Sequence, residues 1–257
     1  VPAGEAPPGI FPAVTLHRST PARFALHINP MRRKNSRLRE SLKAGLQDAS
    51  AVYEGRNPDE ASDMRQATIS RKTAETAIDL SIDIDGSGVS TIDTGIPFFD
   101  HMLTLFSKHG LFDLNVKTVG DIEVDYHHTI EDTGIVIGDC LREALGSKEG
   151  IRRYGCCYLP MDETLARVVV DLSNRPHLEF RAPAGTPSAP NMPFTLVEEF
   201  CRAVASNLRA NIHVEVLYGR DGHHIAEAVF KGLARALRDA CERDARVKGI
   251  PSTKDAL

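Results

Sequence analysis

An internal duplication restricts the possible folds of this chain more than any other feature of its sequence. The residues HHTIE at positions 127–131 recur 96 positions later as HHIAE at positions 223–227. A period of this length is too long for a solenoid, in which the repeats span about 20 to 50 residues. We therefore expect one domain with internal pseudo-symmetry, made of two similar lobes.

Each copy of the motif is predicted to open a long helix that follows a β-strand. Alternation of apolar and polar residues marks strands, and apolar residues spaced three or four apart mark helices. In the first half, the patterns predict strands at 76–85, 111–118 and 122–126 and helices at 97–110 and 127–145. In the second half, they predict strands at 165–172, 177–182 and 212–218 and helices at 195–210 and 223–243. The shared order of elements favours an α+β fold in which sheets pack against helices.

The beginning of the chain differs in composition from the rest. The first 63 residues contain nine Lys and Arg, seven Asp and Glu and seven of the fifteen prolines, without sustained apolar periodicity. Such a segment buries too little apolar surface to offset the entropy lost on ordering. We expect residues 1–66 to be a disordered extension, or upstream sequence wrongly joined to the protein, since Met64 offers a later start. We expect the protein to be cytoplasmic. The alternative is a plastid, if the extension is a transit peptide.

Charge and hydropathy exclude several classes of protein. The formal net charge is −4 and the pI is near 6.2, which argues against a general binder of nucleic acid or anionic membranes. No apolar run reaches the length of about 18 residues that a spanning helix needs. The five cysteines form no CxxC pair and are odd in number, which suits free thiols in a reducing compartment. We expect neither a nucleic-acid partner nor a membrane.

The HHxxE motif predicts metal binding when it opens a helix. In each copy both histidines lie within one helical turn of the glutamate. The two adjacent histidines diverge by about 100° around the helix, so they suit two different ions. A solvated or hydrogen-bonded histidine pair is the alternative, but its recurrence at equivalent places disfavours chance. Imidazole and carboxylate without cysteine suit Mn, Fe, Zn or Ni.

Six ordered motifs between residues 71 and 257 resemble those of the imidazoleglycerol-phosphate dehydratases. They are RKTAET at 71–76, GIPFFDHM at 95–102, HHTIED at 127–132, GIRRY at 150–154, HHIAEA at 223–228 with Lys231, and IPSTK at 250–254. The resemblance implies dehydration of D-erythro-imidazole glycerol phosphate to imidazole acetol phosphate in L-histidine biosynthesis. It also implies two βαβ-type lobes, at about 67–150 and 151–246, like domain 2 of ribosomal protein S5.

The same resemblance implies a site with two Mn²⁺ ions, on which the substrate imidazole is held as imidazolate and water leaves through a diazafulvene-like intermediate. The implied metal ligands are His101, His127, His128, Glu131, Glu199, His223, His224 and Glu227. Glu199 stands where the family commonly has histidine, and it follows His101 by 98 positions, close to the repeat spacing. The alternative is an exposed helix glutamate, with Glu198 as the ligand or none.

Catalytic and substrate-binding residues are also implied by the resemblance. The catalytic residues are Glu75, Glu227 and Lys231, although Glu75 could be a solvated strand-edge carboxylate and Lys231 a plain surface lysine. The substrate-binding residues are Glu75, Arg153, Arg175, Lys231, Ser252 and Lys254, in a domain of residues 67–257 whose C-terminal tail closes over the substrate.

The family further implies a homo-oligomer of twenty-four subunits, with active sites shared between chains. Two other functions use the same ligands. One is a metal-dependent hydrolase or a different lyase, and the other is a noncatalytic metal-binding or storage protein.

Overall fold

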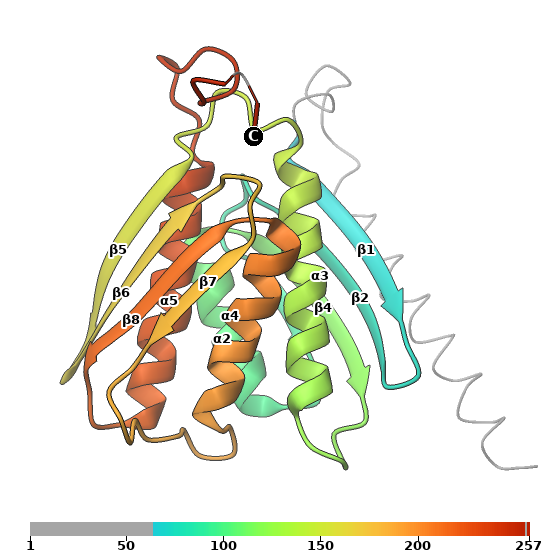
Figure 1. Ribbon diagram of the computed structural model, residues 1–257. Coiled ribbons are helices and arrows are strands. Elements are labelled where there is room, and N and C mark those ends of the chain that lie inside the picture. The colour runs from blue at the N-terminus through green and yellow to red at the C-terminus, as the bar shows by residue number, and fades with distance from the viewer. Residues whose placement is uncertain (1–63, 255) are drawn as a thin grey trace, which may run out of the picture. The chain divides into compact units, whose positions relative to one another are not determined.

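The computed structural model describes residues 64–254, 256 and 257, and these form two lobes of equal plan (Figure 1). The first lobe contains β1 (Gln66–Lys72), β2 (Thr76–Asp83), β3 (Ser90–Asp93), α2 (Pro97–Gly110), β4 (Asp113–Gly120) and α3 (His127–Leu145). The second contains β5 (Tyr154–Met161), β6 (Thr164–Asp171), β7 (His177–Arg181), α4 (Phe194–Leu208), β8 (Asn211–Tyr218) and α5 (Gly222–Cys241). The expected extension at residues 1–66 lies outside the described residues, apart from its last three.

The two sheets have the same strand order and the same strand directions. The first is ordered β1-β2-β4-β3 and the second β5-β6-β8-β7. In each sheet the first three strands are antiparallel, and the short last strand pairs in parallel with its neighbour. The predicted α+β fold with duplicated lobes is therefore confirmed.

Helices from different lobes pack against one another between the two sheets (Figure 1). α3 covers β1 and β2 and lies along α4, while α5 covers β5 and β6 and lies along α2. The rings of Phe99, Phe200 and Phe230 are fully buried between these helices, with Phe200 stacked on Phe230 at 4.8 Å. The apolar stripe of each helix thus forms the core shared by both lobes.

Glycines allow α3 and α4 to approach closely. A Cβ atom added at Gly138 would lie 2.9 Å from the backbone of Val204 and of Leu208. One added at Gly134 would lie 2.9 Å from the Cβ of Ala203. Because higher numbers on α3 face higher numbers on α4, the two helices run parallel, and their first turns lie at the same end.

One predicted strand is wrong, and three strands were not predicted. Residues 122–126 form a turn in which the backbone N–H of Val124 donates to the carbonyl of Asp121. The apolar side chains of Ile122 and Val124 suggested a strand, but both are exposed. The missed strands β1, β3 and β5 carry polar or exposed aromatic residues on their outer faces, which weakens their apolar alternation.

Candidate metal and phosphate sites

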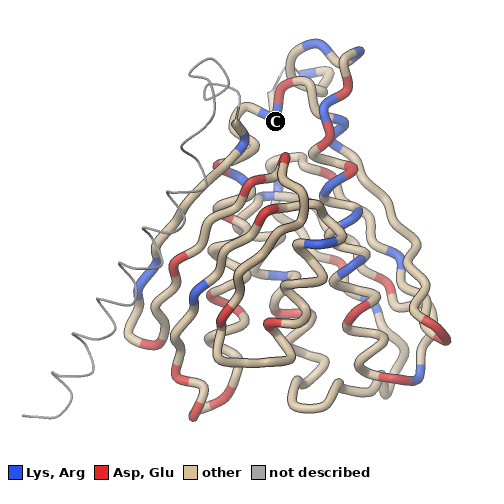
Figure 2. The backbone as a smooth tube through the Cα atoms, turned by 180° about the vertical axis from the view of Figure 1, so that it is seen from behind, with Lys and Arg blue, Asp and Glu red and all other residues tan. Residues whose placement is uncertain are grey.

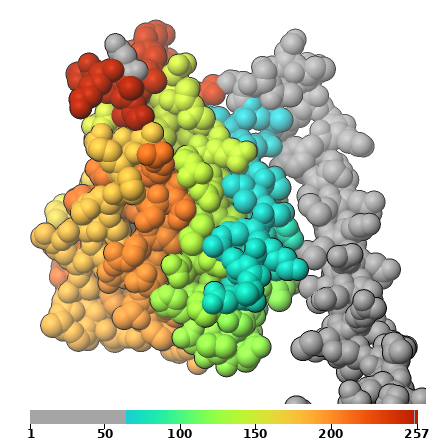
Figure 3. All heavy atoms as spheres, turned by 45° about the vertical axis from the view of Figure 1, so that its right-hand side comes forward, coloured from blue at the N-terminus to red at the C-terminus, as the bar shows by residue number. Residues whose placement is uncertain are grey.

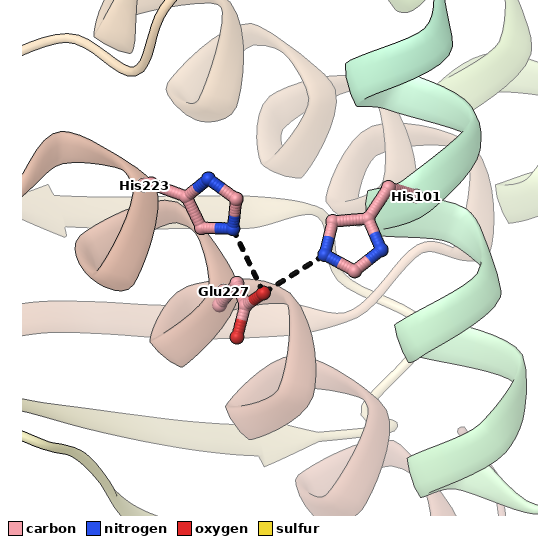
Figure 4. A group of neighbouring side chains, drawn as sticks. All are labelled: His101, His223 and Glu227. Atoms are coloured by element: carbon pink, nitrogen blue, oxygen red, sulfur yellow. Dashed lines mark hydrogen bonds and ion pairs between the residues drawn. The ribbon is translucent and has the colours of Figure 1, made fainter.

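Two helices from different lobes bring three of the predicted metal ligands together (Figure 4). His101 comes from α2, and His223 and Glu227 come from the first turns of α5. The Nε2 atoms of His101 and His223 lie 2.8 Å and 3.0 Å from Oε1 of Glu227. One candidate ligand atom from each residue lies within 4.8 Å of the other two. Two imidazoles and one carboxylate are a donor set that fits a divalent transition metal.

Glu227 is the buried member of this group, with 6% of its surface exposed. Its other oxygen, Oε2, accepts a hydrogen bond of 2.6 Å from Nζ of Lys231. Burial alone would raise the pKa of Glu227, but hydrogen bonds from Lys231, His101 and His223 outweigh it and hold the pKa at about 2. The carboxylate is therefore ionised and ready to bind a cation.

The first copy of the motif repeats only part of this group. Nε2 of His127 lies 3.2 Å from Oε2 of Glu131, one turn further along α3. Glu199 lies on α4, which packs on α3 as α2 packs on α5. Glu199 lies on the partner helix of α3, as His101 lies on the partner helix of α5, but among the described residues it does not join His127 and Glu131 in a group of three close ligand atoms. Its carboxylate instead pairs with Nε of Arg202 at 3.4 Å.

The second histidine of each motif points to a carboxylate that the sequence did not predict. Nδ1 of His128 lies 3.0 Å from Oδ2 of Asp121, and Nδ1 of His224 lies 2.8 Å from Oε2 of Glu163. These hydrogen bonds raise the pKa of each histidine, and the bond from His224 lowers the pKa of Glu163 to about 2. Glu163 lies in a turn 61 positions from His224, and Asp121 lies in the connection seven positions before His128. No pattern in the sequence identifies either carboxylate as the partner of a histidine.

The Nε2 atom of each of these histidines faces a second carboxylate. Oε1 of Glu75 lies 3.8 Å from Nε2 of His128, and Oδ2 of Asp162 lies 3.8 Å from Nε2 of His224. Glu75 was predicted from the sequence and Asp162 was not. Both carboxylates lie in hairpin turns, between β1 and β2 and between β5 and β6.

The predicted phosphate-binding residues gather around Asp171 and the C-terminal segment. Arg153 donates from Nε and Nη2 to the two oxygens of Asp171, at 2.7 Å and 3.2 Å, and from Nη1 to the carbonyl of Pro251. The bond to Asp171 raises the pKa of Arg153. Nη2 of Arg175 lies 3.9 Å from the same carboxylate, and Ser252 follows Pro251 directly.

Hydrogen bonds join the C-terminal segment to the two loops that carry these arginines. The N–H of Gly150 donates to the carbonyl of Gly249, and Nδ2 of Asn174 donates to the carbonyl of Leu257. The segment, which carries Lys254, lies over the chain near residue 150 (Figure 3). Several of its residues are Lys or Arg, coloured blue in Figure 2.

Within one chain the predicted metal ligands on α5 and the predicted phosphate-binding residue Arg153 lie at opposite ends of this helix. The N–H of Arg153 donates to the carbonyl of Ala240 in the last turn of this helix, whereas His223 lies in its first turn. At about 1.5 Å of rise per residue, the two ends are about 25 Å apart. The chain therefore presents two separate half-sites.

No helix in the described part of the chain is both long enough and apolar enough to span a membrane.

The sequence is similar to known imidazoleglycerol-phosphate dehydratases. A family model for imidazoleglycerol-phosphate dehydratase matches residues 94–237. The imidazoleglycerol-phosphate dehydratase of Akkermansia muciniphila is 61% identical over 196 residues, which cover 76% of this chain and 100% of that relative. The protein of the same name from Acetivibrio thermocellus is 56% identical over 193 residues, which cover 75% of this chain and 99% of that relative.

The fold is also similar to that of solved imidazoleglycerol-phosphate dehydratase structures. The crystal structure of imidazoleglycerol-phosphate dehydratase from Staphylococcus aureus superposes with a TM-score of 0.63 at 42% identity, covering 70% of this chain and 99% of that one. The Pyrococcus furiosus structure superposes with a TM-score of 0.64 at 38% identity, covering 74% and 100%.

Proposed function

The chain belongs to the imidazoleglycerol-phosphate dehydratase family, and we propose that two Mn²⁺ ions held by its duplicated motifs support the reaction of that family. Membership makes the protein an enzyme, a hydro-lyase of histidine biosynthesis. We assign D-erythro-imidazole glycerol phosphate as the substrate and imidazole acetol phosphate as the product. The observation that carries the metal assignment is the group of His101, His223 and Glu227, two imidazoles around an ionised buried carboxylate.

The same donor chemistry supports the second ion. His127 and Glu131 repeat the arrangement of His223 and Glu227, and we assign Glu199, on the helix that packs against α3, as their third ligand. On binding the ion, the carboxylate of Glu199 would leave its ion pair with Arg202. The Nε2 atoms of His128 and His224, whose Nδ1 atoms face Asp121 and Glu163, complete the proposed ligand set. Bound Mn²⁺ would supply the positive charge that favours the deprotonated imidazole ring of the substrate.

Proton transfer is assigned to residues next to these ligands. Glu75 has a half-exposed carboxylate 3.8 Å from His128, so it can exchange a proton with a substrate lying beside the ligand. Lys231 is mostly buried and hydrogen-bonded to Glu227, which argues against a plain surface lysine. Its ammonium group can donate a proton to the departing hydroxyl. Arg153, Arg175, Ser252 and Lys254 would hold the phosphate through charge-assisted hydrogen bonds.

The separation of the two half-sites supports active sites built from more than one chain. The imidazole and the phosphate of the substrate are joined by only a three-carbon chain, which cannot bridge about 25 Å along α5. The metal ligands of one subunit must therefore meet the phosphate-binding residues of another. This requirement agrees with the homo-oligomer that we propose, with twenty-four subunits as in the family.

The direct test is an assay of imidazole acetol phosphate formation by protein stripped of metal, with and without added Mn²⁺. We expect product only with Mn²⁺, no product from His224→Ala, and retained Mn²⁺ binding but little product from Glu75→Gln. Release of inorganic phosphate without dehydration would instead identify a hydrolase. Mn²⁺ binding without any turnover would identify a storage protein.

A further inference from the structure

We propose that Asp121 and Glu163 are positioning residues that orient His128 and His224 toward the metal ions. The inference rests on the proposed function, because it concerns ligands of the proposed Mn²⁺ site. It adds two residues that hold ligands in place, and neither of them touches an ion itself. Each acts by holding the Nδ1 side of one imidazole ring.

The stronger case is Glu163, whose carboxylate has a separate task for each oxygen. Oε1 accepts backbone N–H groups of Arg220 and Asp221, at 3.2 Å and 2.9 Å. Oε2 accepts from Nδ1 of His224 at 2.8 Å. The side chain thereby ties the β5–β6 turn to the start of α5 and fixes the ring of His224 at that start.

In the first lobe, the carboxylate that faces Nδ1 of the second histidine comes from the connection before the helix and not from a hairpin turn. Residues 121–126 join β4 to α3, whereas only residues 219–221 join β8 to α5. The longer connection has room for Asp121, whose two oxygens lie 3.2 Å and 3.0 Å from Nδ1 of His128. Glu75, which precedes β2 as Glu163 precedes β6, is consequently left free to face Nε2 of His128.

The carboxylate decides which ring nitrogen can bind a metal. An ionised carboxylate only accepts hydrogen bonds, so the Nδ1 atom that faces it must carry the proton. In a neutral imidazole the other nitrogen, Nε2, then has the free lone pair and can act as a ligand. Carboxylates that fix the tautomer of a ligating histidine in this way raise metal affinity about 10- to 100-fold.

Glu163→Gln tests this directly, because an amide has only one oxygen. If that oxygen keeps the backbone N–H groups of Arg220 and Asp221, the NH₂ group faces His224 and requires Nδ1 to accept. The proton then moves to Nε2 and blocks the ligand position. Asp121→Asn makes the corresponding change at His128. Glu242→Gln is the matched control, because Glu242 pairs with Arg152 just beyond the opposite end of α5.

The measurement is isothermal titration of the full-length, metal-free protein with Mn²⁺ alone. We expect two binding events per subunit in the unchanged protein and in Glu242→Gln. In Glu163→Gln and in Asp121→Asn one event weakens at least tenfold while the other is retained. Asp121→Glu, which keeps the carboxylate, should recover most of the affinity that Asp121→Asn loses.

Wild-type affinity for both ions in Glu163→Gln and in Asp121→Asn would overturn the inference. So would an equal loss of both binding events, with a lower melting temperature of the metal-free protein, because that result indicates structural damage. Failure of the proposed function is recognised separately, on the unchanged protein, which would then bind no Mn²⁺ or form no product.

Discussion

Sharing of active sites between subunits can be tested by mixing two impaired variants. His224→Ala removes a proposed metal ligand at the start of α5. Arg175→Ala removes a proposed phosphate contact near its other end, and the exposed side chain of Arg175 makes this change compatible with folding. Loss of a charged hydrogen-bond partner costs about 1.5 to 3 kcal/mol, which lowers kcat/KM by roughly 10- to 150-fold. We expect no activity from His224→Ala and at most about a tenth of the wild-type activity from Arg175→Ala.

The expected gain on mixing follows from the separation of about 25 Å along α5. If the two residues of one active site come from different chains, about a quarter of the sites in a random equal mixture combine an intact His224 with an intact Arg175. If both came from the same chain, no intact site would form. The expected specific activity is therefore about a quarter of the wild-type value, against at most about a twentieth for single-chain sites.

The assay requires that subunits exchange. Both variants are stripped of metal, mixed, and reassembled with Mn²⁺, and native mass spectrometry of differently tagged chains confirms mixed oligomers. A mixture of separately assembled variants serves as the control and should show no more than the average activity of the two variants. Mixed oligomers that show only the average activity of the two variants would refute the shared site.

Three further predictions concern packing, thiols and metal removal. A Cβ atom added at Gly155 would lie 1.9 Å from the carbonyl oxygen of Ala236, so Gly155→Ala should lower the free energy of unfolding by about 3 kcal/mol. Cys156→Ser, at an exposed neighbouring position, is the control and should leave the free energy of unfolding nearly unchanged. Equal melting temperatures of the two variants would contradict this packing. Ellman's reagent should leave the thiols of Cys140, Cys201 and Cys241 unmodified in the native protein, because these side chains are buried and burial raises their pKa to about 12. Rapid labelling of all five cysteines would argue against the fold. Chelation of Mn²⁺ should reduce the size of the proposed assembly in light scattering, because ions bound between chains would stabilise it. An unchanged size would count against ligands shared between chains.

The sequence by itself determined the features that depend on local periodicity. The repeated HHxxE motif predicted two equivalent lobes and placed His127 and His223 at helix starts, as the structure confirms. Helical spacing also determined that each glutamate lies one turn from its first histidine. Periodicity failed at residues 122–126, because an alternation of exposed side chains does not require a neighbouring strand.

Only the tertiary structure decided which helices meet. The pairing of α2 with α5 brings His101 to Glu227 across 126 positions, and no local pattern specifies such a contact. The same holds for Glu163, which reaches His224 from a turn 61 positions away. Spacing along a helix fixes which side chains share its face, but the packing of apolar stripes from both lobes decides what that face meets. The packing also sets the proposed metal ligands and the proposed phosphate-binding residues at opposite ends of α5, and so favours an active site built from several chains.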